Sequence, residues 1–147
     1  MKEQLYPLKF IPIASLKPWG GTALVEVLGK KFTGKNDNSR RLCSQEGTLI
    51  GESWELSNIG GQNSVIGNGY LKGRTIDEIM QAYHKRVVGD NVFNHYGTQF
   101  PLLIKFLNVE GKLSVQVHPD DKIAAERYNS FGKVEVWYIL DAKADAK

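Results

Sequence analysis

The sequence predicts a mainly β protein, in which an antiparallel β core closes as a barrel or half-barrel and carries a few helices. Three observations support this class. Fifteen glycines against five prolines indicate a turn-rich chain. About seven short apolar runs have the character of strands, and only two or three segments have helical spacing.

Length and composition exclude several classes of partner. A chain of 147 residues with 41% hydrophobic and 24% charged residues fits one soluble globular domain. The net charge of +3 is mild and lacks the clustered basic stripe of a nucleic-acid-binding protein, although it favours a small anionic substrate. No apolar signal core or transmembrane run is found, so we expect no membrane partner and a cytoplasmic location. The single cysteine, Cys43, excludes an internal disulfide and fits a reducing compartment.

The first part of the chain predicts little regular structure. Residues 8–13 indicate a short edge strand, and residues 17–21 indicate a turn that carries Trp19. Residues 22–28 predict a short helix capped by a threonine and ended by a glycine. Residues 30–47 are polar and predict an exposed loop.

The middle of the chain contains two short strands and a helix. Residues 51–57 alternate as a strand, with Glu52 on the same face as a tryptophan, and residues 63–66 predict a second strand. Thr75 and Glu78 form a capping box that begins a helix. The apolar face of this helix is expected to comprise Ile76, Ile79, Met80, Tyr83 and Val87, and the helix to end at a glycine.

A lysine interrupts the most apolar run. Residues 90–99 predict a polar connector, and the histidines at 84 and 95 are expected to be surface or partly buried side chains without a ligand role. Residues 100–109 form a near-continuous apolar run, which predicts a strand buried on both faces. Within it, Lys105 needs a partner or a polar pocket. The alternative is a lysine that reaches solvent from an edge strand.

Two runs near the end of the chain alternate polar residues with valines. Ser114, Gln116 and His118 share one face of a predicted strand at 113–118, while Lys133 and Glu135 share a face next to a predicted strand at 134–140. A helix over residues 120–128 is expected between them, with an aspartate cap directly after Pro119.

If the two strands face each other, an amide oxygen, an imidazole nitrogen and a carboxylate converge beside a lysine. This donor set suits zinc. The alternative is the solvated face of an amphipathic strand pair.

The same residues carry a family resemblance. The sequence resembles type I phosphomannose isomerases in Gln-x-His-Pro-Asp-Asp (116–121), Lys-x-Glu-x-Trp-Tyr (133–138), Trp-Gly-Gly (19–21), Gly-Glu-Ser-Trp-Glu-Leu-Ser (51–57) and Phe-Pro-Leu-Leu-Ile-Lys (100–105). These segments run along nearly the whole chain in the right order, and they correspond to the N-terminal half or so of such an enzyme.

The resemblance implies a cupin-like (RmlC-like) jelly-roll barrel or half-barrel and a zinc-dependent aldose–ketose isomerase. Its substrate would be a sugar phosphate, with mannose 6-phosphate and fructose 6-phosphate interconverted through an enediol. It implies zinc ligands at Gln116, His118 and Glu135, and a proton-transferring Lys133. It implies substrate-binding roles for Trp19, Glu52, Lys105 and Ser114.

The family takes a fourth zinc ligand, a histidine, and a catalytic arginine from farther downstream. We therefore expect residues 1–147 to form a single catalytic domain that is a fragment of a longer enzyme, with little isomerase activity alone. An exposed barrel edge predicts a homodimer. Two alternatives are a catalytically silent metal- or sugar-binding cupin module and a purely structural β domain.

Overall fold

The computed structural model describes residues 4–32, 47–59 and 61–146. It divides into two units, Met1–Leu113 and Ser114–Lys147, each of which is described separately. Cys43 and most of the predicted loop at 30–47 lie outside the described residues. Within the described residues, no helix is long and apolar enough to cross a membrane.

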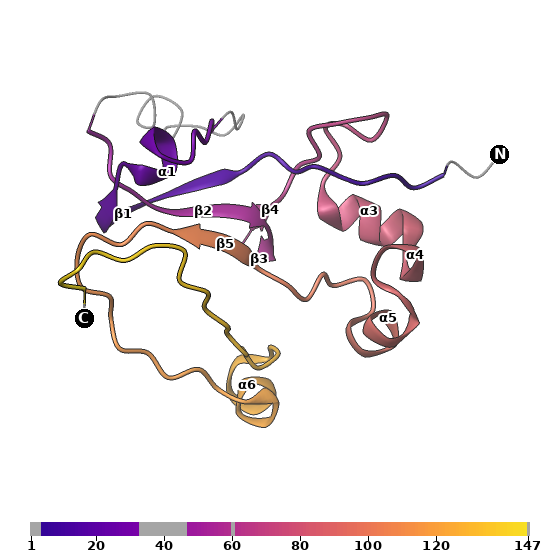
Figure 1. Cartoon of the computed structure of the whole chain (residues 1–147). Helices are drawn as coiled ribbons and strands as arrows, with labels where there is room; N and C mark the ends of the chain where they lie inside the picture. Colours follow the sequence, from indigo (N-terminus) through magenta and orange to yellow (C-terminus); the bar gives the residue numbers. More distant parts are fainter. Residues whose placement is uncertain (1–3, 33–46, 60, 147) are drawn as a thin grey trace. The chain divides into compact units, whose positions relative to one another are not determined.

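The first unit contains a three-stranded antiparallel sheet in the order β1-β2-β5 (Figure 1). Its strands are β1 (Ile13–Gly21), β2 (Ile50–Leu56) and β5 (Ile104–Leu107). The central strand β2 confirms the strand predicted at 51–57. The chain has no closed barrel among its described residues, in contrast to the architecture expected from the sequence.

The predicted turn at 17–21 is wrong, because these residues complete β1. The register with β2 shifts after Ser15 and again between Leu16 and Gly21, so the strand is bulged where Pro18 lacks a backbone donor. Gly20 permits the close approach of the two strands, since a Cβ there would lie 2.5 Å from the backbone nitrogen of Gly51.

Several predicted strands are shorter than expected. Residues 8–13 contribute only a bridge from Phe10 to Ile66, together with the start of β1. Of the strand predicted at 63–66, Asn63 lies in a small hairpin of β3 (Asn58–Ile59) and β4 (Gln62–Asn63), and Val65 and Ile66 make only isolated bridges. Strand β5 is a strand of four residues, and the side chains of Leu102 and Ile104 are exposed, so burial on both faces was the wrong expectation.

Helix α1 (Ala23–Glu26) is shorter than predicted, and its cap comes from a distant residue. The hydroxyl of Thr22 donates to Glu26 Oε2 at 2.6 Å and makes no capping bond. The first helical amide, Ala23 N, instead donates to the side-chain oxygen of Asn108 at 2.9 Å. The segment after β5 therefore supplies the cap that the sequence assigned to Thr22.

Helix α3 (Ile76–Tyr83) begins with the predicted capping box. Glu78 N donates to Thr75 Oγ1 at 3.3 Å, and Thr75 N donates to Glu78 Oε2 at 2.7 Å. The core of the first unit lies against this helix, as the apolar spacing predicted, and its buried residues are Ile66, Leu71, Ile76, Ile79, Met80 and Phe100.

The predicted single helix is broken at His84, whose φ of 49° is unusual for a residue other than glycine. It continues as α4 (Lys85–Val88). Residues expected to form a polar connector fold as α5 (Asp90–Tyr96). The ring of His84 lies 5.5 Å from that of Phe93 on α5, and this contact accompanies the change of direction.

The second unit contains α6 (Asp121–Tyr128) between two irregular segments (Figure 1). The predicted cap is confirmed, since Asp120 Oδ1 accepts from Ile123 N at 2.8 Å. The strands predicted at 113–118 and 134–140 do not form, because neither backbone is paired in a ladder within the described residues. One main-chain bond joins the two segments, from Lys133 N to Pro119 O at 3.2 Å.

Candidate active site

Three of the predicted site residues converge in the second unit although no strand pair holds them. Glu135 Oε2 lies 2.9 Å from His118 Nε2 and 2.7 Å from Lys133 Nζ. The lysine nitrogen lies 3.2 Å from the same histidine nitrogen. A carboxylate, an imidazole and an ammonium therefore meet across a sequence separation of seventeen residues.

Helix α6 brings the two irregular segments together. The chain returns past the start of the helix at Gly132, whose amide donates to Asp121 Oδ1 at 2.9 Å. A Cβ on Gly132 would lie 2.6 Å from Asp121 N and 2.7 Å from the carbonyl carbon of Asp120. Only a residue without a side chain fits this close passage. The turn at Gly132 therefore places Lys133 next to the start of α6.

Glu135 is strongly held as a carboxylate. The ammonium of Lys133 on Oε2, and the indole of Trp137, which donates to Oε1 at 2.7 Å, lower the pKa of Glu135 to about 2. The carboxylate is therefore ionised at neutral pH and both of its oxygens are engaged. No role for Trp137 was predicted from the sequence.

Gln116 and Ser114 pair with each other. The amide nitrogen of Gln116 donates to Ser114 Oγ at 2.8 Å. This bond uses the amide nitrogen and not the amide oxygen, which is the atom that would bind a metal ion. The predicted ligand set of Gln116, His118 and Glu135 therefore stays a prediction.

The chemistry of His118 and Glu135 fits a divalent ion. Two donors that are each about 2.0–2.2 Å from one zinc ion at a tetrahedral angle lie roughly 3.3–3.6 Å apart. The observed separation of 2.9 Å is slightly shorter. A small increase in the distance between the two side chains would allow both to bind one zinc ion. Among the described residues, no group of three or more His, Cys, Asp and Glu side chains could hold a metal ion, so a third ligand from this part of the chain must be of another type, such as Gln116.

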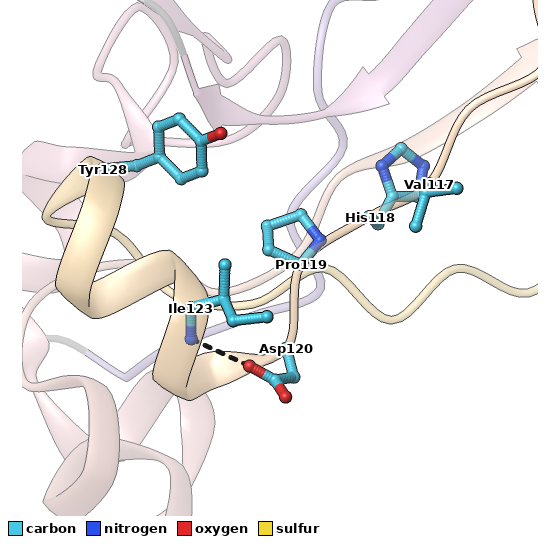
Figure 2. Close-up of a pocket in the computed structure, with 6 residues that line it drawn as sticks. All are labelled: Val117, His118, Pro119, Asp120, Ile123 and Tyr128. Carbon is cyan, nitrogen blue, oxygen red and sulfur yellow. Dashed lines mark hydrogen bonds between the residues drawn. The ribbon is translucent and has the colours of Figure 1, made fainter.

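A shallow hollow of about 400 Å³ lies beside His118 (Figure 2). Its lining residues are Val117, His118, Pro119, Asp120, Ile123 and Tyr128. Figure 2 shows Tyr128 at one end of this group and His118 with Val117 at the other. All six residues belong to the second unit, so this unit alone offers a partly apolar surface next to the candidate ligands.

A second charged cluster lies in the first unit. Lys105 Nζ on β5 lies 3.2 Å from Glu52 Oε1 on β2, and Trp54 Nε1 donates to Glu52 Oε2 at 2.8 Å. Register explains the contact, since Lys105 stands opposite Trp54, which shares a strand face with Glu52. The sequence predicted that Lys105 needs a partner, and the structure identifies Glu52.

The environment of Glu52 has opposing effects on its ionisation. Glu52 is only 7% exposed. Burial raises its pKa, but the hydrogen bonds from Trp54 and Lys105 and the positive charges of Lys105 and Lys17 together lower it further. The net effect is a pKa below the ordinary value, so the buried residue is an ionised partner of Lys105.

Both clusters share a pattern that the sequence analysis missed. In Glu52-Ser53-Trp54 and in Glu135-Val136-Trp137, the indole two residues after the glutamate donates to its carboxylate. A lysine bonds the other oxygen in each case. The repeated Glu-x-Trp spacing is visible in the sequence and was the available signal.

Trp19 packs over β2 on the side away from Glu52. Its ring atom Cζ3 lies 2.8 Å from the position that a Cβ on Gly51 would take. Gly51 and Glu52 are neighbours on the strand and point to opposite faces. The structure therefore brings Glu52 and Lys105 together and places Trp19 against the other face of β2.

Comparisons with known proteins identify the chain's relatives. The family described as "Phosphomannose isomerase type I, catalytic domain" matches residues 8–143. Mannose-6-phosphate isomerase ManA of Bacillus subtilis (strain 168) is 37% identical over 142 residues, which is 96% of this chain and 39% of the relative. Probable mannose-6-phosphate isomerase GmuF of the same organism is 36% identical over 143 residues, with 97% and 40% covered.

A solved structure agrees with these relatives. The crystal structure of the mannose 6-phosphate isomerase from Bacillus subtilis matches with a TM-score of 0.70 and 34% identity, over 93% of this chain and 38% of that chain. The chain thus spans about two-fifths of the length of the relatives that it matches.

Proposed function

Because the chain belongs to the type I phosphomannose isomerase family, matching its catalytic domain, we propose that it is part of a zinc-dependent aldose–ketose isomerase. The proposed reaction interconverts mannose 6-phosphate and fructose 6-phosphate. The family places the fold in the cupin superfamily. A single domain over residues 1–147, contributing to a jelly-roll barrel or half-barrel, is part of the proposal, as is the cytoplasmic location expected from the sequence.

The observation that carries the proposal is the convergence of His118, Lys133 and Glu135 within 3.2 Å of one another. In the proposed mechanism His118 and Glu135 hold zinc, with Gln116 as a third ligand. A bound zinc ion would supply a Lewis acid for the vicinal oxygens of the sugar. Lys133, as the neutral amine, would accept the proton from one carbon and return it to the adjacent carbon, which passes the substrate through an enediol.

The other predicted residues are assigned to substrate binding. Lys105, held by Glu52, supplies a fixed positive charge for a phosphorylated sugar. Ser114 supplies a hydroxyl for the phosphate, and its present bond to Gln116 would be exchanged for that contact. Trp19 is proposed to offer an aromatic surface on the opposite face of β2, and not beside Lys105.

Zinc binding by the purified 147-residue chain tests the proposal. Equilibrium dialysis with elemental analysis should find one zinc per chain, and His118→Ala should abolish it. His95→Ala is the matched control, because the ring of His95 packs on Tyr96 in the first unit and is expected to leave zinc binding unchanged. Wild-type zinc content in the His118→Ala variant would contradict the assignment.

An isomerase assay separates the two functions that a zinc-binding chain could have. Turnover of mannose 6-phosphate, coupled to consumption of fructose 6-phosphate, would establish the enzyme. Because residues 1–147 are expected to have little isomerase activity alone, the assay discriminates in a longer chain that includes the downstream histidine and arginine. Zinc binding without turnover in that longer chain would favour the catalytically silent metal- or sugar-binding cupin module. A chain that binds neither zinc nor sugar phosphate would be a structural β domain.

The proposal also includes a homodimer. Val115, Val117, Val134 and Val136 on the two irregular segments are each at least 89% exposed. A symmetric dimer buries the four side chains of each protomer, eight in all, which stabilises it by roughly 12–24 kcal/mol. This gain exceeds an association cost of about 4–15 kcal/mol. Sedimentation equilibrium should therefore show a dimer at micromolar concentration, and Val115→Ser with Val136→Ser should weaken it. A monomer at every concentration would refute this part.

A further inference from the structure

The ammonium of Lys133 contacts the same two atoms that the proposed function assigns to the metal ion. It lies 2.7 Å from Glu135 Oε2 and 3.2 Å from His118 Nε2. Its backbone amide is fixed by the carbonyl of Pro119 at 3.2 Å. The lysine is thus placed by the local fold, and its positive charge lies where the proposed ligands converge.

The three groups cannot all be satisfied at once. His118 Nε2 either donates a proton to Glu135 or accepts one from Lys133, because a single ring nitrogen has one hydrogen-bonding position. A zinc ion needs the lone pair of this nitrogen and one carboxylate oxygen. An ammonium in contact with both atoms competes for them and repels a divalent cation.

We propose that the ammonium of Lys133 is an internal cation that competes with a divalent ion for His118 and Glu135. This ammonium holds His118 and Glu135 close together until a divalent ion replaces it. Replacement releases the lysine, so loading of the metal and freeing of the ammonium are one coupled event. This inference rests on the proposed function, because it requires that His118 and Glu135 bind the ion.

Lys133 has two opposing effects on zinc affinity. It competes with the ion for the ligand atoms, which weakens binding, and it holds these atoms close together, which strengthens binding. Lys133 is 45% exposed, so its ion pair with Glu135 is screened by solvent and preorganises the site only weakly. Trp137 donates to the other oxygen of Glu135, a contact that does not involve the lysine. Competition therefore outweighs preorganisation, and removal of the ammonium should tighten zinc binding.

The test is a zinc titration of four 147-residue chains by competition with a chromogenic chelator. Relative to wild type, Lys133→Met should bind zinc about 3- to 10-fold more tightly. Lys133→Arg should bind more weakly, because its permanent charge can engage both partners. Lys122→Met on α6 removes one exposed charge from the same unit and is the matched control, with wild-type affinity expected.

A metal-free readout supports the titration. In the ¹H–¹⁵N spectrum, the indole signal of Trp137, assigned with Trp137→Phe, reports on Glu135 through the bond to Oε1. We expect Lys133→Met to shift this signal in the absence of metal, and zinc to shift it in wild type. Lys122→Met should leave it unchanged.

The outcomes separate this inference from the proposed function. Equal or weaker zinc binding by Lys133→Met, with a wild-type chain that binds zinc, would overturn the internal cation and leave the proposed function standing. Zinc binding by Lys133→Met alone would support the inference in its strongest form. Binding by neither chain would overturn both.

Discussion

Replacing Lys105 with methionine should destabilise the first unit more at neutral pH than at acid pH. The substitution keeps the length and apolar stem of the side chain but removes the cation next to Glu52, whose side chain is 9% exposed. Removing one partner of a buried ion pair leaves an uncompensated charge, which costs 3–5 kcal/mol in fully buried cases. The side chain of Lys105 is 20% exposed, so the pair is not fully buried. We therefore expect the substitution to lower the free energy of unfolding by about 2–4 kcal/mol at pH 7.

The dependence on pH follows from the pKa of Glu52. In the wild-type chain this pKa lies below the ordinary value, so the stabilisation is present above the unfolded-state pKa and is lost as the pH falls through it and then through the folded pKa. Without Lys105, burial, the largest influence on this pKa, is opposed only by Trp54 and Lys17, so we expect the pKa of Glu52 to rise relative to wild type. Protonation then relieves the unpaired charge, and the difference between variant and wild type should shrink at pH 4.

Urea denaturation followed by tryptophan fluorescence measures both effects. The matched control is Lys85→Met, which removes the cation from an ion pair with Asp90 that is 62% and 68% exposed. An exposed pair of this kind contributes about 0–1 kcal/mol, so the control should unfold almost as wild type does. Equal losses for Lys105→Met at pH 7 and pH 4, or equal losses for the two variants, would refute the reasoning.

Two further substitutions test the turn and the cap. Gly132→Ala puts a Cβ 2.6 Å from the amide nitrogen of Asp121 and should displace the following segment, which lowers zinc affinity roughly 10- to 100-fold as for other residues that orient ligands. Gly67→Ala is the control in the same zinc titration, because its Cβ would lie 3.3 Å from the nearest neighbouring atom. Equal zinc affinities for the two variants would contradict the role of the turn. Thr75→Ala removes the hydrogen bond that the amide of Glu78 donates and should lower the free energy of unfolding by about 1 kcal/mol. The same urea experiment measures this loss, and an unchanged unfolding midpoint would contradict the role of the cap.

Features that depend on residues within four positions could be predicted from the sequence. The capping box of Thr75 and Glu78 and the aspartate cap at Asp120 are both confirmed. Local hydrogen bonds require no knowledge of distant segments. The strand at 51–57 was also predicted correctly from its local alternation, and it forms because distant strands pair with it on either side.

Features that depend on a partner could not be predicted in this way. The apolar alternation at 113–118 and 134–140 was read as strands, yet a strand exists only where another backbone accepts its hydrogen bonds, and none does so within the described residues. Helix α5 was missed because polar residues surround its few apolar side chains, Val92, Phe93 and Tyr96, which are half-buried in the structure. Its position follows from the reversal at His84.

The candidate site shows the same division. The sequence was sufficient to single out His118, Lys133 and Glu135 by residue type and spacing, and to indicate that Lys105 needs a partner. The tertiary structure was needed to show that Glu52, 53 residues away, is that partner. It also showed that Gly132, and not a strand pair, brings Glu135 to His118. Residue chemistry is a local property that can be read along the chain, whereas the partner of a charge depends on how distant segments pack.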